Sequence, residues 1–473
     1  MQRLFDLFAN AGHELYLVGG AVRDMVLGMD YRKLDDLDFA TDCLPEQTQR
    51  ILRDGSFGVY KTGWNFGTVG TVLNGEADEG YPKDVQITTY RSGEVYRSGS
   101  RHPAVVFGKS IEEDLGRRDL AINSMAQSAT GEIIDLHGGR DDIKARRLKV
   151  LGEPAVTLRE DPLRLLRVAR FQSQLGFQPT SLVRAACTEV APAILDISRE
   201  RWFDEMSKLL LGGFVADGLQ LLLDTRIMGF ILPEVAALAG FHETSRHHHK
   251  DVWAHTKQVV AQSSPNPAVR WTALLHDVGK VWTREYAPGG KVHFFRHEDL
   301  GAVMFEGIAP RFRFSNTLRR RVRFLIKNHL RGNLYDGQWT DSAVRRFRKD
   351  IGEHLGDLLD FTKADITSAN PQRRATNLRL ADELSRRCEE IAEKDGRQPP
   401  LPKGIGNAIM ERFELRPGRH IGDLRRGMEE AVIQGELPPG AEYDVYLAWL
   451  KDSGLLDQLG ESERAVARPK DSE

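Results

Sequence analysis

Leu17-Val-Gly-Gly-Ala-Val-Arg-Asp24 is followed by Asp36-Leu-Asp38. These two stretches predict the fold of the first part of the chain. Residues 15–18 form a short apolar run that predicts a strand, and residues 21–27 have the spacing of a helix. The two glycines between them allow a tight turn and a close approach to a ligand. The free N–H groups at the start of the helix suit a triphosphate.

The pair Asp36 and Asp38 predicts a metal site. Residues 37–40 are typical of a second strand, and side chains alternate along a strand, so both carboxylates point the same way. Carboxylates placed in this way can hold Mg²⁺ and stabilise the attacking and leaving oxygens of an in-line displacement. Arg23 can add a charge-assisted contact. A solvated acidic strand end is the competing interpretation, because Asp-x-Asp is a common pattern.

Composition excludes several classes of protein. The 473 residues include 66 Lys and Arg against 68 Asp and Glu, so the net charge of −2 rules out a global basic field for nucleic acid. Cys43, Cys187 and Cys388 lie too far apart for a disulfide framework or a cysteine zinc ribbon. We find no signal peptide and no apolar run of the ~20 residues that a membrane span needs. We therefore expect a cytoplasmic protein that has no membrane partner.

The chain divides into a mixed head and a helical body. Residues 68–73 and 85–90 are further predicted strands, residues 74–82 a turn-rich segment and residues 91–101 a mobile loop. Strand signals stop after about residue 143, which predicts an α+β protein with an α/β head on a long all-α body. The Pro-rich residues 397–402 suggest a linker. We expect a head over 1–150, a neck over 151–240, a third domain over 241–375, and a helical tail over 376–473 with a frayed end.

Two more motifs follow the carboxylate pair. They are Glu112-Glu-Asp-Leu-Gly-Arg-Arg-Asp-Leu-Ala-Ile-Asn123 and Arg159-Glu-Asp-Pro-Leu-Arg-Leu-Leu-Arg-Val-Ala-Arg-Phe171. Together with the first motif, and in this order, they resemble class II tRNA nucleotidyltransferases, the CCA-adding enzymes and bacterial poly(A) polymerases. The resemblance implies a head of the DNA polymerase β type that uses Mg²⁺. It covers at least residues 15–370.

The resemblance also implies which residues bind the nucleotide. The donor fork of Arg118 and the acceptor of Asp119 would read the ribose, and Asp161 and Arg164 would match the base edge of ATP or CTP. Glu160 would orient Arg164. The expected nucleotide-binding set is Gly20, Arg23, Arg118, Asp119, Asp161, Arg164, Arg167 and Arg170.

Simpler interpretations compete with these roles. Arg117 or Arg118 could form a surface ion pair with Glu113 or Asp114. Asp161 could be the N-cap of a helix whose first residue is Pro162, and the cap and the base contact can hold together.

One position departs from the family pattern. The family often has a third carboxylate where this chain has Gln86. Strand alternation places Asp84 on the same side as Gln86. Either two carboxylates suffice or Asp84 partly substitutes, and we favour the first.

The middle of the chain carries a second constellation. Asp251-Val-Trp-Ala-His255 is followed by Leu274-Leu-His-Asp-Val-Gly-Lys280, then by His297, His329 and Asp365. Histidine and aspartate ligands without a thiolate suit a hydrolytic divalent metal, and a metal-activated water could attack a phosphoester.

This second constellation resembles the HD phosphohydrolase domain. The resemblance places Ni²⁺, Mn²⁺ or Mg²⁺ on His255, His276, Asp277 and Asp365, with His297 and His329 lining the site. It implies phosphatase and 2′,3′-cyclic phosphodiesterase activity, although such domains can also be vestigial. The histidines at 247–249 would form the mouth of the site or a polar turn.

The full set predicts template-independent addition of CCA to the acceptor end of tRNA from CTP and ATP. Basic clusters at 319–323, 345–349, 373–374 and 425–426 offer phosphate contacts, and each alone is typical of a solvated helix face. Within the same class, an enzyme that adds only A and a poly(A) polymerase are the alternatives. From another class, the alternative is an HD phosphohydrolase with a degenerate RNA-binding head.

Overall fold

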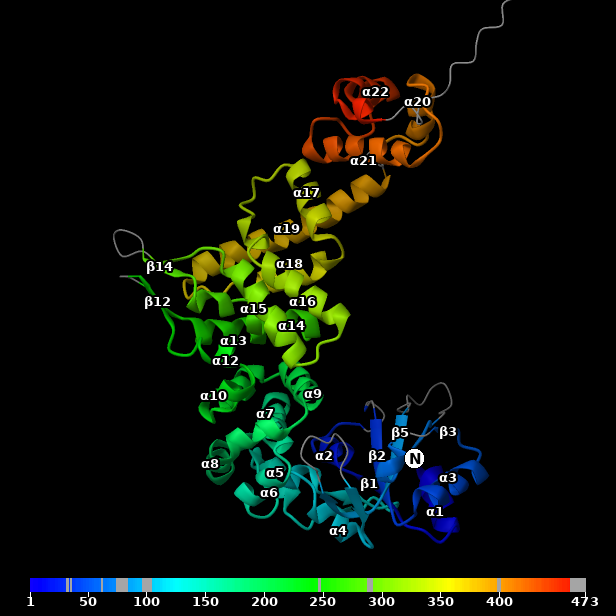
Figure 1. Ribbon diagram of the computed structural model, residues 1–473. Coiled ribbons are helices and arrows are strands. Elements are labelled where there is room, and N and C mark those ends of the chain that lie inside the picture. Colours follow the sequence, from blue (N-terminus) through cyan, green and yellow to red (C-terminus); the bar gives the residue numbers. More distant parts are fainter. Residues whose placement is uncertain are drawn as a thin grey trace, which may run out of the picture. The chain divides into compact units, whose positions relative to one another are not determined.

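The head is built on one mixed β-sheet. In this computed structural model the described residues are 1–30, 34, 36–60, 63–73, 84–95, 104–245, 248–286, 292–397 and 401–459. The sheet contains β1 (Leu15–Val18), β2 (Asp36–Thr41), β3 (Val59–Tyr60), β4 (Thr68–Thr71), β5 (Asp84–Thr89), β8 (Ala126–Gln127) and β9 (Ile133–Ile134). Their order is β3-β4-β5-β2-β1-β8-β9 (Figure 1). The predicted α/β head is therefore confirmed.

Helices and one hairpin complete the head. They are α1 (Gln2–Asn10), α2 (Gly20–Val26), α3 (Pro45–Asp54), η2 (Trp64–Phe66), β6 (Arg91–Val95), β7 (Ala104–Phe107), α4 (Ile111–Gly116), η3 (Ala121–Asn123) and α5 (Gly139–Lys144). The four predicted strands and the predicted helix after the glycine turn are confirmed.

The predicted mobile loop at residues 91–101 is wrong in its first part. Residues 91–95 form β6, which pairs with β7, because backbone pairing with an apolar strand outweighs the weak strand propensity of Ser and Gly. Residues 96–103 lie outside the described residues, as does the turn-rich segment predicted at 74–82.

Helices follow the head. They are α6 (Pro154–Glu160), α7 (Leu163–Leu175), α8 (Ser181–Val190), η4 (Ala191–Asp196), α9 (Arg199–Leu210), α10 (Val215–Asp224), α11 (Ile227–Ile231), α12 (Pro233–Ala236), α13 (Val252–Gln262), α14 (Pro267–Leu275), η5 (Val278–Val281), α15 (His297–Arg311) and α16 (Asn316–Asn328). Trp271 of α14 is fully buried and packs on Phe203 of α9, with ring centres 6.0 Å apart, and on Phe314, with ring centres 4.9 Å apart. This packing fixes the helix that leads to His276.

The expectation that strands stop after residue 143 is wrong in detail. Short pairs form between β10 (Arg147–Leu148) and β11 (Gln178–Pro179), between β12 (His242–Ser245) and β13 (His248–Asp251), and between β14 (Arg284–Tyr286) and β15 (Val292–Phe294). Strands of two to four residues are too short for an alternating pattern to be recognised.

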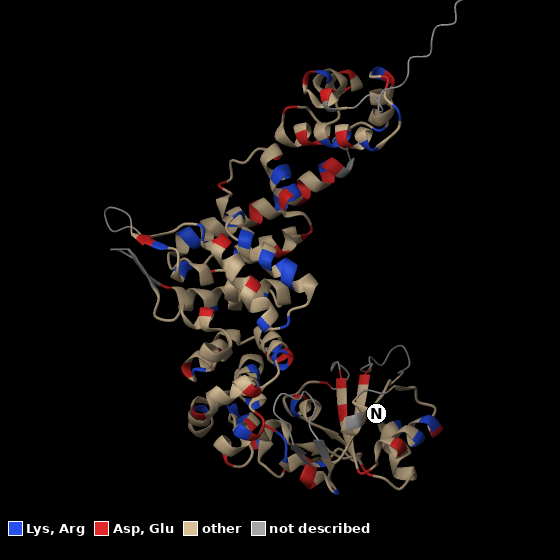
Figure 2. Cartoon of the chain, viewed as in Figure 1, with Lys and Arg blue, Asp and Glu red and all other residues tan. Residues whose placement is uncertain are grey.

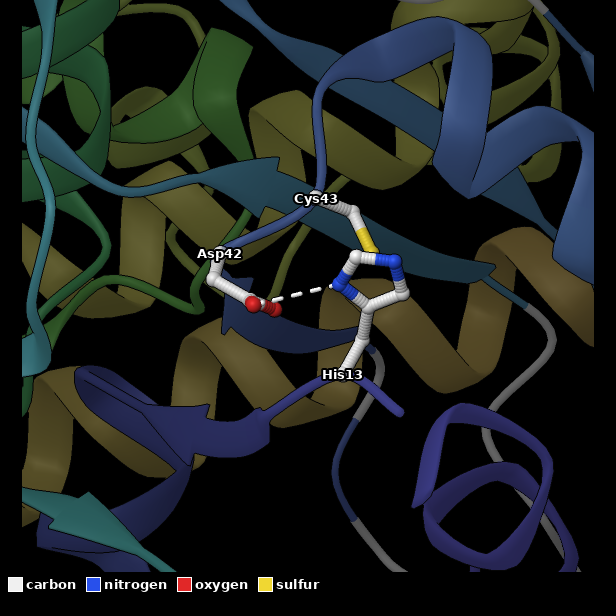
Figure 3. Close-up of side chains that lie close together, drawn as sticks. All are labelled: His13, Asp42 and Cys43. Atoms are coloured by element: carbon white, nitrogen blue, oxygen red, sulfur yellow. Dashed lines mark hydrogen bonds and ion pairs between the residues drawn. The ribbon is translucent and has the colours of Figure 1, made fainter. Parts of the chain in front are cut away.

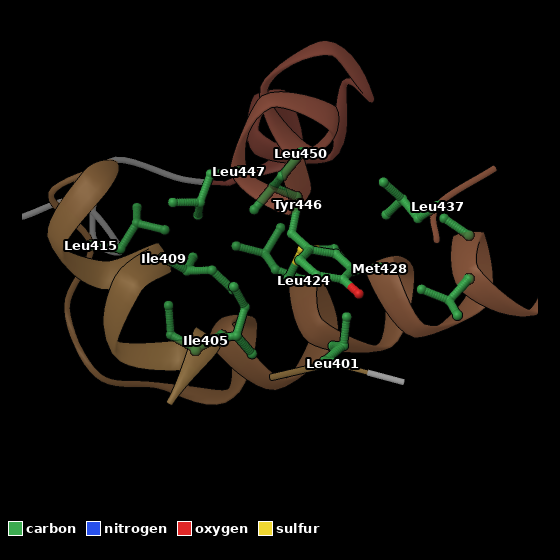
Figure 4. Close-up of a cluster of buried hydrophobic side chains, with 13 residues drawn as sticks. Leu401, Ile405, Ile409, Leu415, Leu424, Met428, Leu437, Tyr446, Leu447 and Leu450 are labelled. Carbon is green, nitrogen blue, oxygen red and sulfur yellow. The ribbon is translucent and has the colours of Figure 1, made fainter. Parts of the chain in front are cut away.

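By backbone contacts the chain divides into two compact units, Met1–Arg323 and Phe324–Glu473. The second unit contains η6 (Gly332–Leu334), α17 (Asp341–Ile351), η7 (Gly352–His354), α18 (Leu355–Ala364), α19 (Pro371–Arg397), α20 (Ile405–Arg412), α21 (Arg419–Gln434), α22 (Tyr443–Asp452) and η8 (Leu455–Gln458). Its last helices share an apolar core around Ile409, Met428 and Tyr446 (Figure 4). Lys349 of α17 pairs with Glu430 of α21 at 3.1 Å, so the tail is not isolated from the helices before it. The four domain limits given above stay predictions.

Candidate functional site

Strand β2 presents two carboxylates on one face. Asp36 and Asp38 are exposed, whereas Leu37 and Phe39 are fully buried. The predicted alternation is therefore confirmed. Figure 2 shows the acidic residues of β2 and β5 in red at the ends of these neighbouring strands.

Strand β5 runs parallel to β2 and places two more polar side chains on the face that carries Asp36 and Asp38. Asp84 is in register with Asp36, and Gln86 with Asp38. The Tyr60 hydroxyl donates to Oδ1 of Asp84 at 3.4 Å. Asp84 thus lies beside the carboxylate pair, and its share in metal binding stays a prediction.

The two β2 carboxylates influence each other. The pKa of Asp38 is raised, first by partial desolvation of its carboxylate by the surrounding protein, although the residue as a whole is exposed, and second by the negative charge of Asp36, while Arg118 acts in the opposite direction. A cation between the two carboxylates would relieve this repulsion, and oxygen donors suit a hard divalent ion. The residues present therefore fit the metal that the sequence predicts.

The glycine turn brings Arg118 close to the backbone. Gly19 has φ of 72°, a conformation that favours glycine, and a Cβ there would lie 2.9 Å from Nη1 of Arg118. Gly20 is the first residue of α2. Only glycine at position 19 therefore permits this approach without displacement of the guanidinium.

Carboxylates hold three arginines near the glycine turn. Arg23 makes a two-point contact with Asp24, at 2.8 and 2.9 Å, and donates to Asn123 Oδ1 at 2.8 Å. Arg118 donates from Nε and Nη2 to Oδ2 of Asp114, and Arg117 donates to Oδ1. The ion pair is thus present but has a buried acid, Asp114, instead of lying on the surface, and it orients Arg118, while the ribose contact stays a prediction.

Asp119 is buried and fully engaged. Its Oδ1 accepts from the Leu120 N–H at 2.9 Å and from Asn123 Nδ2 at 3.3 Å, and its Oδ2 accepts from Arg167 Nε at 2.6 Å. Burial by itself would raise the pKa of Asp119, but Arg167 and the hydrogen bonds lower it to about 2. The structure therefore places Asp119 as a connection between the head and α7.

Arg167 and Arg170 share a buried acid. Glu205 of α9 lies 3.0 Å from Nη1 of Arg170 and 3.7 Å from Nη1 of Arg167. The ring of Phe171 has three guanidinium groups near it, from Arg23, Arg167 and Arg170, at 5.3, 5.5 and 4.3 Å from its centre. This arrangement holds the arginines in fixed positions next to the first turn of α2.

Asp161 and Arg164 lie at the junction of α6 and α7. Asp161 Oδ1 accepts from the Leu163 N–H at 3.2 Å, as a cap would, and Oδ2 accepts from Arg201 Nη2 at 3.1 Å. Helix α7 begins at Leu163, so Pro162 precedes its first residue instead of forming it. The N-cap residue of α7 is Pro162, so the predicted N-cap at Asp161 is wrong by one position, although Oδ1 of Asp161 still caps the N–H of Leu163. The base contact of Asp161 stays a prediction.

Two backbone carbonyl groups fix the guanidinium of Arg164. It donates to the carbonyls of Thr157 and Arg117, each at 3.0 Å, and lies 3.7 Å from Glu160. The expected orientation by Glu160 agrees with this contact.

Sequence reasoning missed Arg201, Glu205 and Phe171. Arg201 and Glu205 are four residues apart on α9, and such a pair resembles any surface ion pair of a helix. The signal that could have identified Glu205 was its place among the apolar residues Trp202, Met206 and Leu209.

The second constellation converges in the first unit. His276 Nε2 lies 3.3 Å from His255 Nε2 and 3.1 Å from Asp277 Oδ2, and His297 Nε2 lies 3.5 Å from Asp277 Oδ1. All four side chains are buried. The proximity predicted for His255, His276, Asp277 and His297 is confirmed.

Backbone carbonyls orient two of these rings. His276 Nδ1 donates to the Ala273 carbonyl and His297 Nδ1 to the Phe294 carbonyl, each at 2.9 Å, if these nitrogens carry the proton. The Nε2 lone pairs then face Asp277, as metal ligands require. Burial by itself would raise the pKa of Asp277, but a protonated His276 and Lys280 hold it well below its usual range, and a bound metal would replace the Nε2 proton of His276. This donor set fits a first-row divalent metal.

The remaining members of the set belong to the second unit. His329 is buried, and its Nδ1 lies 2.7 Å from the Ile326 carbonyl. Asp365 accepts from Asn333 Nδ2 at 3.0 Å. Their part in a metal site stays a prediction. Of the histidines at 247–249, His247 lies outside the described residues, and the other two belong to β13.

Another group of ligand-type residues lies at the opposite end of β2. His13 Nδ1 donates to Asp42 Oδ2 at 3.1 Å, and Cys43 lies beside them (Figure 3). Asp42 also accepts from the Glu14 N–H at 3.0 Å. Burial raises the pKa of the Cys43 thiol to about 11, so this group is a packing contact between the loop before β1 and the end of β2.

Several predicted basic residues are paired within the protein. Arg319 and Arg323 pair with Glu306 of α15, and Arg345 pairs with Asp395 of α19. Which cluster meets RNA stays a prediction. Within the part of the chain that the structure describes, no helix is long and apolar enough to cross a membrane.

Three family models match consecutive parts of the chain. The poly A polymerase head domain matches residues 15–149, the probable RNA and SrmB-binding site of polymerase A matches residues 176–238, and the HD domain matches residues 247–386. Nucleotidyltransferase and HD domains are typically metal-dependent, which agrees with the donor sets described above.

Two relatives and one solved structure that resemble this chain are CCA-adding enzymes. The CCA-adding enzyme of Streptococcus pneumoniae serotype 19F is 38% identical over 441 residues, which are 93% of this chain and 94% of the relative. The CCA-adding enzyme of Geobacillus kaustophilus is 41% identical over 226 residues, which are 48% of this chain. This chain spans about half, 52%, of the length of that relative. The crystal structure of the Bacillus stearothermophilus CCA-adding enzyme in complex with CTP is 26% identical, covers 97% of both chains and has a TM-score of 0.65.

Proposed function

This chain belongs to the CCA-adding enzyme family of tRNA nucleotidyltransferases, and we propose that it adds C, C and A to the 3′ end of tRNA from CTP and ATP without a template. The observation that carries this proposal is the pair Asp36 and Asp38, which face the same side of β2 near the turn that admits Arg118. The enzyme would work in the cytoplasm, where its tRNA substrate is found.

In the proposed reaction the terminal hydroxyl of the tRNA attacks the α-phosphorus of the nucleotide, and pyrophosphate leaves. Asp36 and Asp38 would hold Mg²⁺, which when bound supplies charge stabilisation for the attacking and leaving oxygens. Gly19 admits the guanidinium of Arg118 beside the backbone, and Gly20 begins α2, whose free N–H groups would face the nucleotide phosphates. Arg23 and Arg118 contribute fixed positive charge, because Asp24 and Asp114 already orient them.

Selection of the base would rest on Asp161 and Arg164. Arg164 is fixed by two carbonyls, so its remaining donors keep one orientation. Asp161 offers an acceptor that Arg201 holds in place. Arg118 and Asp119 would read the ribose, and Arg167 and Arg170 would support the nucleotide.

A second activity is favoured by the buried HD cluster. His255, His276, Asp277 and Asp365 would hold Ni²⁺, Mn²⁺ or Mg²⁺, which when bound supplies an activated water for hydrolysis of phosphoesters. The carbonyls behind His276 and His297 keep the ring nitrogens aimed at Asp277. The substrate class would be a terminal phosphate or a 2′,3′-cyclic phosphate of RNA.

The experiment that tests the main proposal is incubation of the purified chain with Mg²⁺ and a tRNA that lacks its 3′ CCA, together with labelled CTP, or with labelled ATP plus unlabelled CTP. We expect incorporation that requires the tRNA. Absence of incorporation from both nucleotides would overturn the proposal and leave the alternative of an HD phosphohydrolase with a degenerate head.

A further inference from the structure

The short hairpin after α14 and η5 carries exposed aromatic side chains. It consists of β14 and β15, in which Arg284 pairs with Phe294 and Tyr286 with Val292 (Figure 1). The Tyr286 side chain is 66% exposed. Burial of such a large ring is energetically favourable, so the exposed Tyr286 side chain can bind a ligand.

One face of the hairpin alternates rings with a cation. Residues paired across two strands share a face of the sheet, so Arg284, Tyr286 and Phe294 lie together. The guanidinium of Arg284 lies 5.5 Å from the Tyr286 ring centre and 4.6 Å from the Phe241 ring centre, within the range of cation–π contacts. We call Phe241, Arg284, Tyr286 and Phe294 the stacking face.

The stacking face is connected directly to the HD cluster. Lys280 Nζ lies 5.6 Å from the Phe294 ring centre and 3.0 Å from Asp277 Oδ2. The carbonyl of Phe294 accepts from His297 Nδ1 at 2.9 Å. One residue of the stacking face therefore positions a ring of the cluster, and a lysine bridges the two.

The other face of the same hairpin provides an internal comparison. Phe295 is 61% exposed, and its ring stacks on His293 with centres 5.0 Å apart and an angle of 10°. His293 pairs with Glu285 on the face opposite Arg284 and Tyr286. Phe295 is thus a similar exposed ring that lies away from the stacking face.

We propose that the stacking face binds the terminal base of the phosphoester presented to the HD cluster, with Tyr286 stacked on the base and Arg284 beside it. The inference rests on the HD phosphohydrolase activity proposed above and adds a determinant of its substrate. The ligand class is a nucleoside 3′-phosphate or 2′,3′-cyclic phosphate, free or at an RNA end. Aromatic rings beside arginine bind single-stranded bases with little preference among them.

A kinetic comparison tests the contribution of the base. Hydrolysis of adenosine 2′,3′-cyclic phosphate is measured against glycerol 1,2-cyclic phosphate, which lacks a base. For Tyr286→Ala we expect KM for the nucleotide to rise about five- to 100-fold, the range of base stacking, while hydrolysis of the glycerol compound is unchanged. Tyr286→Phe keeps the ring and should behave as the wild type, and Phe295→Ala is the matched control.

A binding measurement separates this inference from the activity on which it rests. The probe is 2-aminopurine riboside 3′-phosphate, whose fluorescence is quenched when the base stacks on a ring. EDTA is present, so that binding is measured without metal-dependent hydrolysis. We expect quenching by the wild type and by Phe295→Ala, and an apparent Kd about five- to 100-fold higher for Tyr286→Ala. Equal Kd values for Tyr286→Ala and the wild type, or an equal loss in Phe295→Ala, would overturn the stacking face even if hydrolysis is found. Quenching that depends on Tyr286 in a protein without hydrolysis would support the stacking face and contradict the phosphohydrolase proposal.

Discussion

Arg167 Nε donates to Asp119 Oδ2 over 2.6 Å, and this pair joins α7 to the segment that follows α4. The pKa of Asp119 in the folded protein is about 2, below the value of about 3.9 in an unfolded chain. Because the folded pKa is the lower one, the pair stabilises the fold fully above about pH 4 and loses this contribution as the pH falls toward 2.

Replacement of Asp119 by Asn should therefore have a pH-dependent cost. We expect the free energy of unfolding in urea to fall by about 3–5 kcal/mol at pH 7, because a buried charge loses its partner. The difference from the wild type should shrink by about 1 kcal/mol between pH 7 and pH 3. A difference of the same size at both pH values would show that the ion pair is not its cause.

Loss of either β2 carboxylate should abolish nucleotide addition. Asp36→Ala and Asp38→Ala each remove an expected metal ligand, so labelled CTP and ATP should no longer be incorporated, while tRNA binding in a filter assay persists. Asp42→Asn is the matched control, because Asp42 follows the same strand but contacts His13 and Glu14. Near-normal addition by Asp36→Ala and Asp38→Ala would remove this site from the mechanism.

Arg201 should influence which nucleotide is chosen. Its Nη2 holds Asp161 Oδ2 at 3.1 Å, and a hydrogen bond to a charged group contributes roughly 1.5–3 kcal/mol. Arg201→Ala should raise KM for CTP and ATP about tenfold or more and increase misincorporation of GTP and UTP, whereas Asp161→Ala should have a larger effect of the same kind. Arg159→Ala is the control, since Arg159 pairs with Glu189. Unchanged relative rates for the four nucleotides in Asp161→Ala would mean that this residue is only a cap.

The two activities should be separable. The HD cluster and the β2 carboxylates have no partner in common among the contacts described above, and mutations at independent sites usually act additively. His276→Ala combined with Asp277→Ala should leave CCA addition largely intact and abolish hydrolysis of a 2′,3′-cyclic phosphate assayed with Ni²⁺, Mn²⁺ or Mg²⁺. Asp36→Ala should show the reverse. A wild-type protein that hydrolyses no phosphoester with any of these metals would make the HD cluster a structural element.

What the sequence predicted correctly depended on local patterns. Alternation along one strand placed Asp36 and Asp38 on the same face, and adjacent residues at the end of a helix brought His276 and Asp277 together. The hydrogen bond from Arg167 to Asp119 spans 48 positions and that from Arg201 to Asp161 spans 40. Such contacts depend on how helices pack, which no local period encodes.

The hairpin of β14 and β15 was missed for a different reason. Each strand has three residues, which is too short for a recognisable alternation. Its exposed ring at Tyr286 became evident only when the register and the burial were known.

The central claim is that the protein's own side chains specify the sequence C, C, A and then end the addition. The most direct measurement is the product length on a sequencing gel when tRNA without its CCA end is incubated with CTP alone, ATP alone, or both. The account predicts two added residues with CTP, none with ATP, and three with both. A single A added only to tRNA that already ends in CC, or a long tail of A from ATP alone, would contradict it in favour of an A-adding enzyme or a poly(A) polymerase.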